Sequence, residues 1–107
     1  MGNFSQALNR RVTIQAPGTI RDEGGGVIEG WAEYAQAWAS IRKTNGMESI
    51  RAGAEGTTVQ ASIRMRYRTD IDASMRIVHG TTIYKILGVL TDEQRKLHVD
   101  FVCEIVT

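Results

Sequence analysis

Hydrophobic and polar residues alternate most regularly over residues 58–68. Val59, Ala61, Ile63, Met65 and Tyr67 fall on one face, and Gln60, Ser62, Arg64, Arg66 and Arg68 fall on the other. Five successive apolar positions at a period of two are typical of a β-strand with one buried face. The pattern therefore predicts a strand over this segment.

The C-terminal segment repeats this alternation, with Leu97, Val99, Phe101, Cys103 and Ile105 on its apolar face. Residues 82–90 are apolar on both faces, with Ile83, Leu87 and Val89 on one and Tyr84, Ile86 and Leu90 on the other. Two apolar faces are typical of a strand in mid-sheet or in an interface. Shorter strands are predicted at Arg11–Gln15 and Met75–Val78, with hairpin turns at His79-Gly80 and Thr91-Asp92-Glu93.

Helical spacing occurs in two places. Trp31, Tyr34, Trp38 and Ile41 recur at intervals of three and four residues, so residues 31–42 fit a helix as well as a strand. A short helix is predicted at 46–55, because Asn45 provides an N-cap, Glu48 completes a capping box and Gly56 offers a stop. The large aromatic side chains are expected mainly in the core: Trp31, Tyr34, Trp38, Tyr67, Tyr84 and Phe101.

Residues 16–30 form the outstanding irregular segment of the sequence. They contain five glycines and Pro17, the only proline of the chain. Loops longer than about 12–15 residues are uncommon in compact domains and are usually functional or disordered. We therefore expect a long, flexible, glycine-rich loop with a functional role.

Composition narrows the class of protein. The chain has 107 residues, with 11 Ile, 8 Val and 10 Thr, and these β-branched side chains favour sheet. The length fits one domain over residues 1–107 with a single core. The formal net charge of +1 disfavours a strongly basic nucleic-acid binder and a polybasic membrane protein. A lone cysteine suits a reducing compartment, and no apolar run is long enough to span a bilayer.

Candidate chemistry is sparse. Cys103 lies on an apolar strand face, where a free cysteine is usually inert, and His79 and His98 are expected to be solvated. No Cys/His/Asp cluster has zinc-site spacing, and Asp70-Ile71-Asp72 lacks the later ligands of a calcium loop. Gly24-Gly25-Gly26 lacks the Lys-Ser/Thr of a phosphate-binding loop. We expect no metal, no cofactor and no enzymatic activity.

Arginines form the one conspicuous charge pattern. Arg64, Arg66 and Arg68 stack along one strand face, and Arg76 is a candidate to join them from the next strand. Such a stripe can contact phosphates. The simpler interpretation, which the pattern alone favours, is a solvated face with nearby carboxylate partners such as Asp70 and Asp72.

Taken in order, the segments resemble those of the tailed-phage head–tail joining proteins, also called head closure or head–tail adaptor proteins. The resemblance covers about 95 residues, and its strength lies in order and spacing rather than in any single motif. It rests on Leu8–Gln15, Asp22 with Gly24-Gly25-Gly26, Trp31, Trp38-Ala39-Ser40-Ile41, Gly46-Met47-Glu48, Ile63–Arg68, Met75-Arg76-Ile77, Tyr84–Val89 and Cys103-Glu104.

The resemblance implies an all-β fold, a small β-barrel or sandwich of about six strands with one short helix and the long glycine-rich loop. The resemblance also implies that residues 31–42 form a long, bulged strand. It implies a virion protein of the neck, made in the host cytoplasm, that forms a homo-oligomeric ring, usually of twelve copies. Partners would be portal and adaptor proteins above the ring and tail proteins below, with packaged double-stranded DNA passing nearby.

Site residues follow from the same resemblance. The long loop would be an assembly element, comprising Thr19, Ile20, Arg21, Asp22, Glu23, Gly24, Gly25, Gly26, Val27 and Ile28. Arg64, Arg66, Arg68 and Arg76 would be candidates to face the DNA channel. Two other classes stay open: a small nucleic-acid-binding barrel that uses the same arginines and aromatics, and an enzyme hidden in a small β fold.

Overall fold

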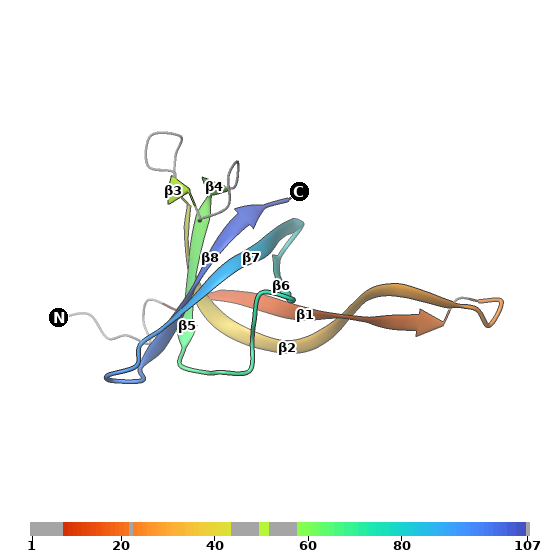
Figure 1. Ribbon diagram of the computed structural model, residues 1–107, viewed down its shortest axis with the longest axis horizontal. Coiled ribbons are helices and arrows are strands. Elements are labelled where there is room, and N and C mark those ends of the chain that lie inside the picture. Colours follow the sequence, from red (N-terminus) through yellow and green to blue (C-terminus); the bar gives the residue numbers. More distant parts are fainter. Residues whose placement is uncertain (1–7, 22, 44–49, 52–57, 107) are drawn as a thin grey trace.

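The described part of this protein, shown as a computed structural model in Figure 1, contains eight β-strands. The structure describes residues 8–21, 23–43, 50–51 and 58–106. The strands are β1 (Arg10–Arg21), β2 (Val27–Lys43), β3 (Ile50–Arg51), β4 (Thr58–Val59), β5 (Ala61–Arg66), β6 (Arg76–His79), β7 (Thr82–Thr91) and β8 (His98–Ile105). The described residues contain no helix, so the all-β prediction is confirmed.

Six of these strands close into an antiparallel barrel in the order β1-β2-β5-β8-β7-β6, while β3 and β4 form a separate two-stranded sheet. Closure satisfies strand edges that would otherwise be open to pairing with other chains. The expectation of a barrel or sandwich of about six strands is thus resolved in favour of the barrel.

Alternation along β5 and β8 builds the core, as the sequence predicts. The inward side chains of these strands and their neighbours are almost inaccessible to solvent, and Tyr84 and Phe101 are the largest of them. The cluster comprises Val12, Ile14, Ala39, Ala61, Ile63, Met65, Ile71, Ile77, Tyr84, Ile86, Val99, Phe101 and Cys103. Most are β-branched or aromatic residues, which pack well on a pleated surface.

A bulge in β7 changes which residues face inward. Tyr84 and Ile86 are buried, but the register with β8 shifts between Ile86 and Gly88, and Val89 then packs against the core while Leu90 is exposed. The extra residue of a bulge interrupts the period of two. The sequence pattern placed Leu90 on the same strand face as Tyr84 and Ile86, and Val89 on the same face as Ile83. Both assignments are wrong, because the bulge reverses the faces after Leu87.

The predicted irregular loop at 16–30 is wrong. Residues 16–21 continue β1 and residues 27–30 begin β2, and the two are paired from Ala16↔Ala32 to Arg21↔Val27. Glycine and proline weaken strand propensity, but the two segments are neighbours in sequence and satisfy each other's backbone groups as a hairpin. Residues 31–42 lie in β2 and are a bulged strand, not a helix.

The predicted helix at 46–55 lies mostly outside the described residues. Its two described residues, Ile50 and Arg51, form β3 and pair with Val59 and Thr58, so a helix is wrong at these positions. The predicted strand over 58–68 is divided at Gln60 into β4 and β5 and ends at Arg66. The hairpin at His79-Gly80 is confirmed, with Gly80 in the left-handed region that this tight turn needs.

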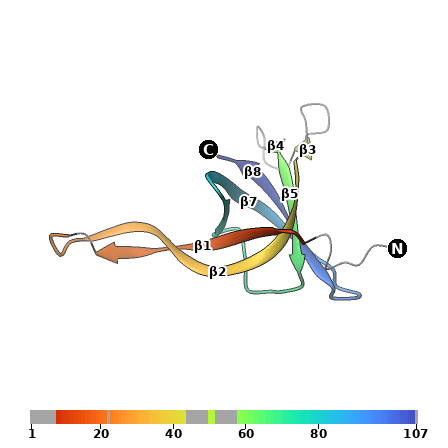
Figure 2. The same ribbon diagram turned by 180° about the vertical axis from the view of Figure 1, so that it is seen from behind.

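The β1–β2 hairpin gives the molecule its elongated shape. Figures 1 and 2 show the outer halves of β1 and β2 projecting well beyond the barrel as a two-stranded ribbon. The principal extents are 55 × 31 × 25 Å and the radius of gyration is 15.1 Å. A compact chain of this length would have a radius of gyration of about 13 Å. The projecting hairpin therefore accounts for the elongation of the molecule.

Candidate functional site

The projecting hairpin, here called the arm, comprises residues 16–21 of β1, residues 27–33 of β2 and the turn between them. Inside the barrel β1 also pairs with β6, but only at residues 13–15, and β2 also pairs with β5, but only at residues 39–43. Each arm strand therefore has one partner and one open edge. Open strand edges are templates for pairing with another chain.

Glycines mark the middle and the end of the arm. Gly18 lies opposite Gly30, so no side-chain pair crosses the ribbon at that point. Gly25 in the turn has a φ of 88°, in the left-handed region that favours glycine. Val27 beside the turn is exposed, as are the carboxylates of Glu23 and Glu29. The end of the arm thus presents an apolar side chain among acidic ones.

An arginine–tryptophan contact holds the base of the arm to the barrel. The guanidinium of Arg76 on β6 stacks over the ring of Trp31, 4.2 Å from its centroid. Arg76 Nε also donates a hydrogen bond of 2.7 Å to Gln15 Oε1 on β1. Cation–π contacts of this kind are worth roughly 0.5–2 kcal/mol. The contact links the arm to β6 at the point where the arm leaves the barrel.

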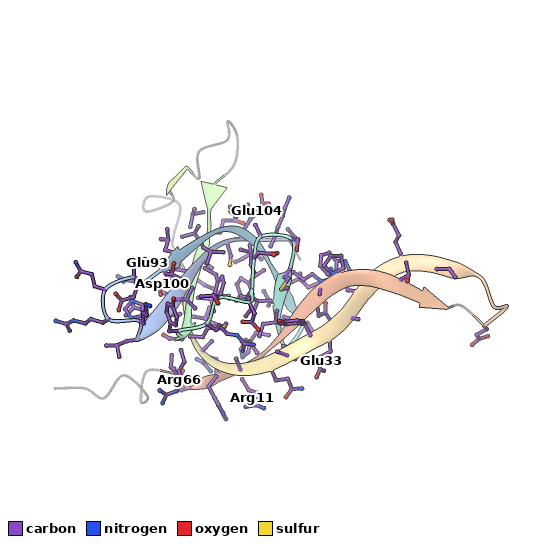
Figure 3. The ribbon with its side chains drawn as sticks, turned by 60° about the horizontal axis from the view of Figure 1, so that its bottom comes forward. Arg11, Glu33, Arg66, Glu93, Asp100 and Glu104 are labelled. Atoms are coloured by element: carbon purple, nitrogen blue, oxygen red, sulfur yellow. The ribbon has the colours of Figure 1, made fainter. Side chains whose placement is uncertain are left out.

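A second surface lies on the barrel, where β1, β2 and β5 meet the segment that follows β5. This hollow, here called the basic groove, has a volume of about 520 Å³. Its lining comprises Leu8, Arg11, Gln36, Ala37, Trp38, Met65, Arg66, Tyr67, Arg68 and Asp70. Figure 3 shows Arg11 and Arg66 on the barrel, on the side away from the end of the arm. Three arginines against one carboxylate make the lining net positive.

Aromatic side chains form part of the groove wall. Trp38 is exposed, and the guanidinium of Arg11 lies 5.5 Å from its ring centroid. Arg11 also donates from Nη2 to Gln36 Oε1 at 3.2 Å. Aromatic and arginine side chains are enriched at the energetically important centres of protein interfaces. The groove therefore has the composition of a protein-binding surface.

A hydrogen-bonded triad fixes the rim of the groove. Arg68 donates to both oxygens of Asp70, at 2.6 and 2.7 Å, and the hydroxyl of Tyr34 donates to Oδ2 at 2.8 Å. The Arg68 guanidinium holds the pKa of Asp70 well below its usual range, and the bond to the Asp70 carboxylate raises the pKa of Tyr34. Tyr34 is the bulged residue of β2, so the triad ties the arm strand to the segment after β5.

The predicted arginine stripe is divided by the fold. Arg64 donates to both oxygens of Asp100 on β8, at 2.8 and 3.0 Å, an interaction that raises the pKa of the guanidinium. Arg68 is engaged with Asp70, and Arg66 is exposed on β5. Arg76 lies on β6, three strands away from β5 around the barrel. The expectation that Arg76 joins the stripe from the next strand is therefore wrong.

The remaining candidates for chemistry are structural. Cys103 is fully buried, and burial raises the pKa of its thiol to about 12, which suppresses its nucleophilicity. His98 Nδ1 lies 4.0 Å from Asp92 Oδ2 in the turn between β7 and β8. Among the described residues no group of His, Cys, Asp and Glu is arranged to hold a metal. None of the described ranges contains a helix able to cross a membrane.

Sequence reasoning missed the aromatic surface. Trp31, Tyr34 and Trp38 were expected in the core, but their exposed fractions are 39%, 44% and 53%. The signal was present in the smaller residues, because Ala35, Ala37 and Ala39 recur at a period of two and pack inward. Of the predicted aromatic core, Tyr84 and Phe101 are confirmed as fully buried.

Three comparisons relate the chain to known proteins. A family model described as phage head completion protein matches residues 5–106. Head completion protein gp7 of Enterobacteria phage HK97 is 38% identical over 72 residues, which span 65% of this chain and 62% of gp7. The chain thus aligns with under two thirds of the length of that relative.

Solved structures share the fold. The solution structure of protein SF1141 from Shigella flexneri 2a has a TM-score of 0.70 and 32% identity, and the match covers 92% of this chain and 93% of that one. A chain in the virion of the native gene transfer agent particle has a TM-score of 0.63 and 20% identity, covering 92% and 96%. At that identity the second likeness shows the fold alone.

Proposed function

The chain belongs to the phage head completion protein family, and we propose that it closes the DNA-filled head and provides a docking surface for the tail. Family membership makes it a structural virion protein of the head–tail junction and not an enzyme. The proposed action is that of one subunit in a homo-oligomeric ring, whose copies meet through the arm. We propose twelve copies, as the sequence resemblance implies.

The arm is the observation that carries this proposal. A two-stranded hairpin is marginally stable by itself in water, and the arm strands have no third strand beside them. An extended element with open edges and exposed aromatic side chains at its base gains most from contact with another protein. Assembly supplies that contact, whereas an isolated subunit does not.

The main binding partners of the proposed ring are proteins and not nucleic acid. The formal net charge of +1 gives no general attraction to nucleic acid, and Arg64 and Arg68 are already engaged by carboxylates. We propose a portal or adaptor protein on one face of the ring and tail proteins on the other. Packaged double-stranded DNA would pass through the channel.

Particles that lack the protein test the closure role. We expect them to package DNA and then lose it, which is measured as nuclease-sensitive DNA and as full heads counted in micrographs. A shortened arm, with residues 19–29 replaced by Asn-Gly between Gly18 and Gly30, should give the same defect while the barrel still folds. Full, stable and tail-competent particles without the protein would contradict the proposal.

Contacts of Arg64, Arg66, Arg68 and Arg76 with channel DNA stay a prediction. The two ion pairs, and the position of Arg76 on the opposite side of the barrel, leave less free positive charge than the sequence spacing suggested. The alternative class, a nucleic-acid-binding barrel, loses support for the same reason. Binding of the isolated protein to a short duplex at low salt, weakening steeply with added salt, would support that alternative.

A further inference from the structure

We propose that the arm of one copy docks in the basic groove of the next copy, so that the ring is joined head to tail by this contact. The inference rests on the proposed ring, and it adds which two surfaces meet. The ligand of the groove is thus the arm of a second copy of this chain.

The arm and the basic groove carry opposite formal charges. Residues 16–33 contain one arginine, Arg21, against Asp22, Glu23, Glu29 and Glu33, which gives the arm a formal charge of −3. The groove lining carries Arg11, Arg66 and Arg68 against Asp70, a formal charge of +2. Among the described side chains, the three glutamates of the arm and Arg11 and Arg66 of the groove are exposed, so opposite charges can steer the two surfaces together during encounter.

The arm and the basic groove also both expose apolar side chains. Val27 near the end of the arm has an exposed fraction of 63%, the highest among the large hydrophobic side chains that the structure describes. The groove offers the exposed ring of Trp38 as an apolar wall, next to the largely buried side chain of Leu8. Docking would bury apolar surface at the centre, with charged groups around it, which is the usual anatomy of a protein interface.

The arm and the basic groove lie on different sides of the barrel, and the arm is long enough to contact a neighbouring copy. In Figure 3 the arm leaves one side of the barrel, whereas Arg66 lies on the far side. The six arm residues of β1 extend roughly 20 Å, far enough to overlap a neighbouring barrel. Two different surfaces at opposite ends of one molecule make a heterologous contact, which generates a ring when its rotation closes.

Two charge-reversal variants separate the surfaces. Glu29→Arg reverses a charge on the arm and leaves the groove intact, and Arg66→Glu does the opposite. Both side chains are exposed, so both variants should fold, which thermal denaturation checks. We expect each variant to associate with itself about tenfold more weakly than the wild type, because like charges then face each other. Sedimentation velocity measures this.

Mixing identifies the contact. The indole N–H signal of Trp38 in labelled Glu29→Arg protein should shift when unlabelled Arg66→Glu protein is added, since that partner has an unmodified arm. Adding unlabelled Glu29→Arg should produce a much smaller shift. The matched control is unlabelled Glu93→Arg, a reversal in the exposed β7–β8 turn outside both surfaces, which should shift the signal as the wild type does.

If the basic groove binds something other than the arm of a second copy, the Trp38 signal should respond differently. No shift of Trp38 at millimolar partner, or equal shifts with all partners, overturns the docking. A shift caused by a short DNA duplex but not by any partner overturns it in favour of phosphate binding. A shift that follows removal of residues 2–6, with no effect of partners, overturns it in favour of the chain's own N-terminus.

The yield of tail-competent particles assembled with these variants tests the arm–groove contact separately from the closure role. Both single reversals should lower the yield of tail-competent particles at least tenfold, and the double variant Glu29→Arg/Arg66→Glu should recover most of it. Full yield with both single variants overturns the arm–groove contact and leaves the closure role standing. The closure role fails separately if particles without the protein keep their DNA.

Discussion

Single residues in this protein act mainly by holding their neighbours in place, and Asp70 does so for two segments of the chain. Its carboxylate accepts hydrogen bonds from Arg68 and from Tyr34, and so joins the bulge of β2 to the segment after β5. Both partners line or border the basic groove. The shape of that surface therefore depends on a carboxylate that stays ionised.

Asp70→Asn should lower the free energy of unfolding by about 1 kcal/mol at pH 7, the upper end for a partly exposed pair. Because the folded protein holds the pKa of Asp70 below the unfolded value of about 3.9, the stabilisation is complete above that pH. It is lost as the pH falls from about 4 toward the lowered pKa. Urea denaturation at several pH values measures the difference.

Glu93→Gln is the control, since it removes a carboxylate from an exposed turn and breaks no ion pair that the structure records for Glu93. Its stability should stay within about 0.5 kcal/mol of the wild type at every pH. A difference between Asp70→Asn and the wild type that persists undiminished at pH 2 would contradict the proposed role of the ionised carboxylate.

The thiol of Cys103 should report on unfolding of the barrel. Its side chain is fully buried, and burial raises the pKa of the thiol to about 12. Reaction with a neutral-pH thiol reagent should therefore be limited by opening of the barrel and should accelerate with urea. Rapid, stoichiometric labelling of the native protein would show that the β5–β8 contact is open in solution.

At the scale of elements, the long strands β1 and β2 serve two purposes. Their inner halves belong to the barrel, where Ala35, Ala37 and Ala39 allow close packing, and their outer halves form the arm. Trp31 and Arg76 lie at the boundary between the two. The arm is therefore an extension of core strands and is positioned by the core.

Trp31→Ala should loosen the arm without affecting the barrel. Loss of the stacked guanidinium, worth about 1 kcal/mol, should speed amide exchange of residues 16–21 and 27–33 about fivefold. Trp38→Ala is the matched control, because it removes an exposed tryptophan with its own arginine partner outside the arm. Equal effects of both variants on the arm would contradict the anchoring role of Trp31.

Much of the barrel could be predicted from sequence, and the arm could not. The inward faces of β5 and β8 follow from a strict period of two in residues such as Ile63 and Phe101. In the arm, Gly18 and Gly30 erase the alternation, so only the pairing of two nearby segments defines the strands. Bulges at Tyr34 and near Leu87 shift the inward face, and such shifts depend on the neighbouring strand rather than on local residue type.

The contacts of the candidate surfaces were even harder to predict from the sequence than the arm. Asp70 was recognised as a possible partner for the arginines, and the structure pairs it with Arg68. The pairing of Arg64 with Asp100 depends on the β5–β8 register, and the contact of Arg76 with Trp31 depends on closure of the barrel. Both are contacts between residues distant in sequence, which a local pattern does not contain.

The whole molecule combines a closed barrel with one projecting arm. Closure leaves the barrel few strand edges to offer, and the arm places two open edges outside it. A subunit of this shape is suited to joining a neighbour on one side while accepting another on the other side. We propose that each subunit of the ring uses its arm and its groove in this way.

Cryo-electron microscopy of the neck in assembled particles would show where each arm lies. We expect a closed ring in which the arm of every copy lies on the basic groove of the next, with Glu29 of one copy near Arg66 of its neighbour. Arms that extend into solvent, or that contact only the barrel of their own subunit, would contradict it.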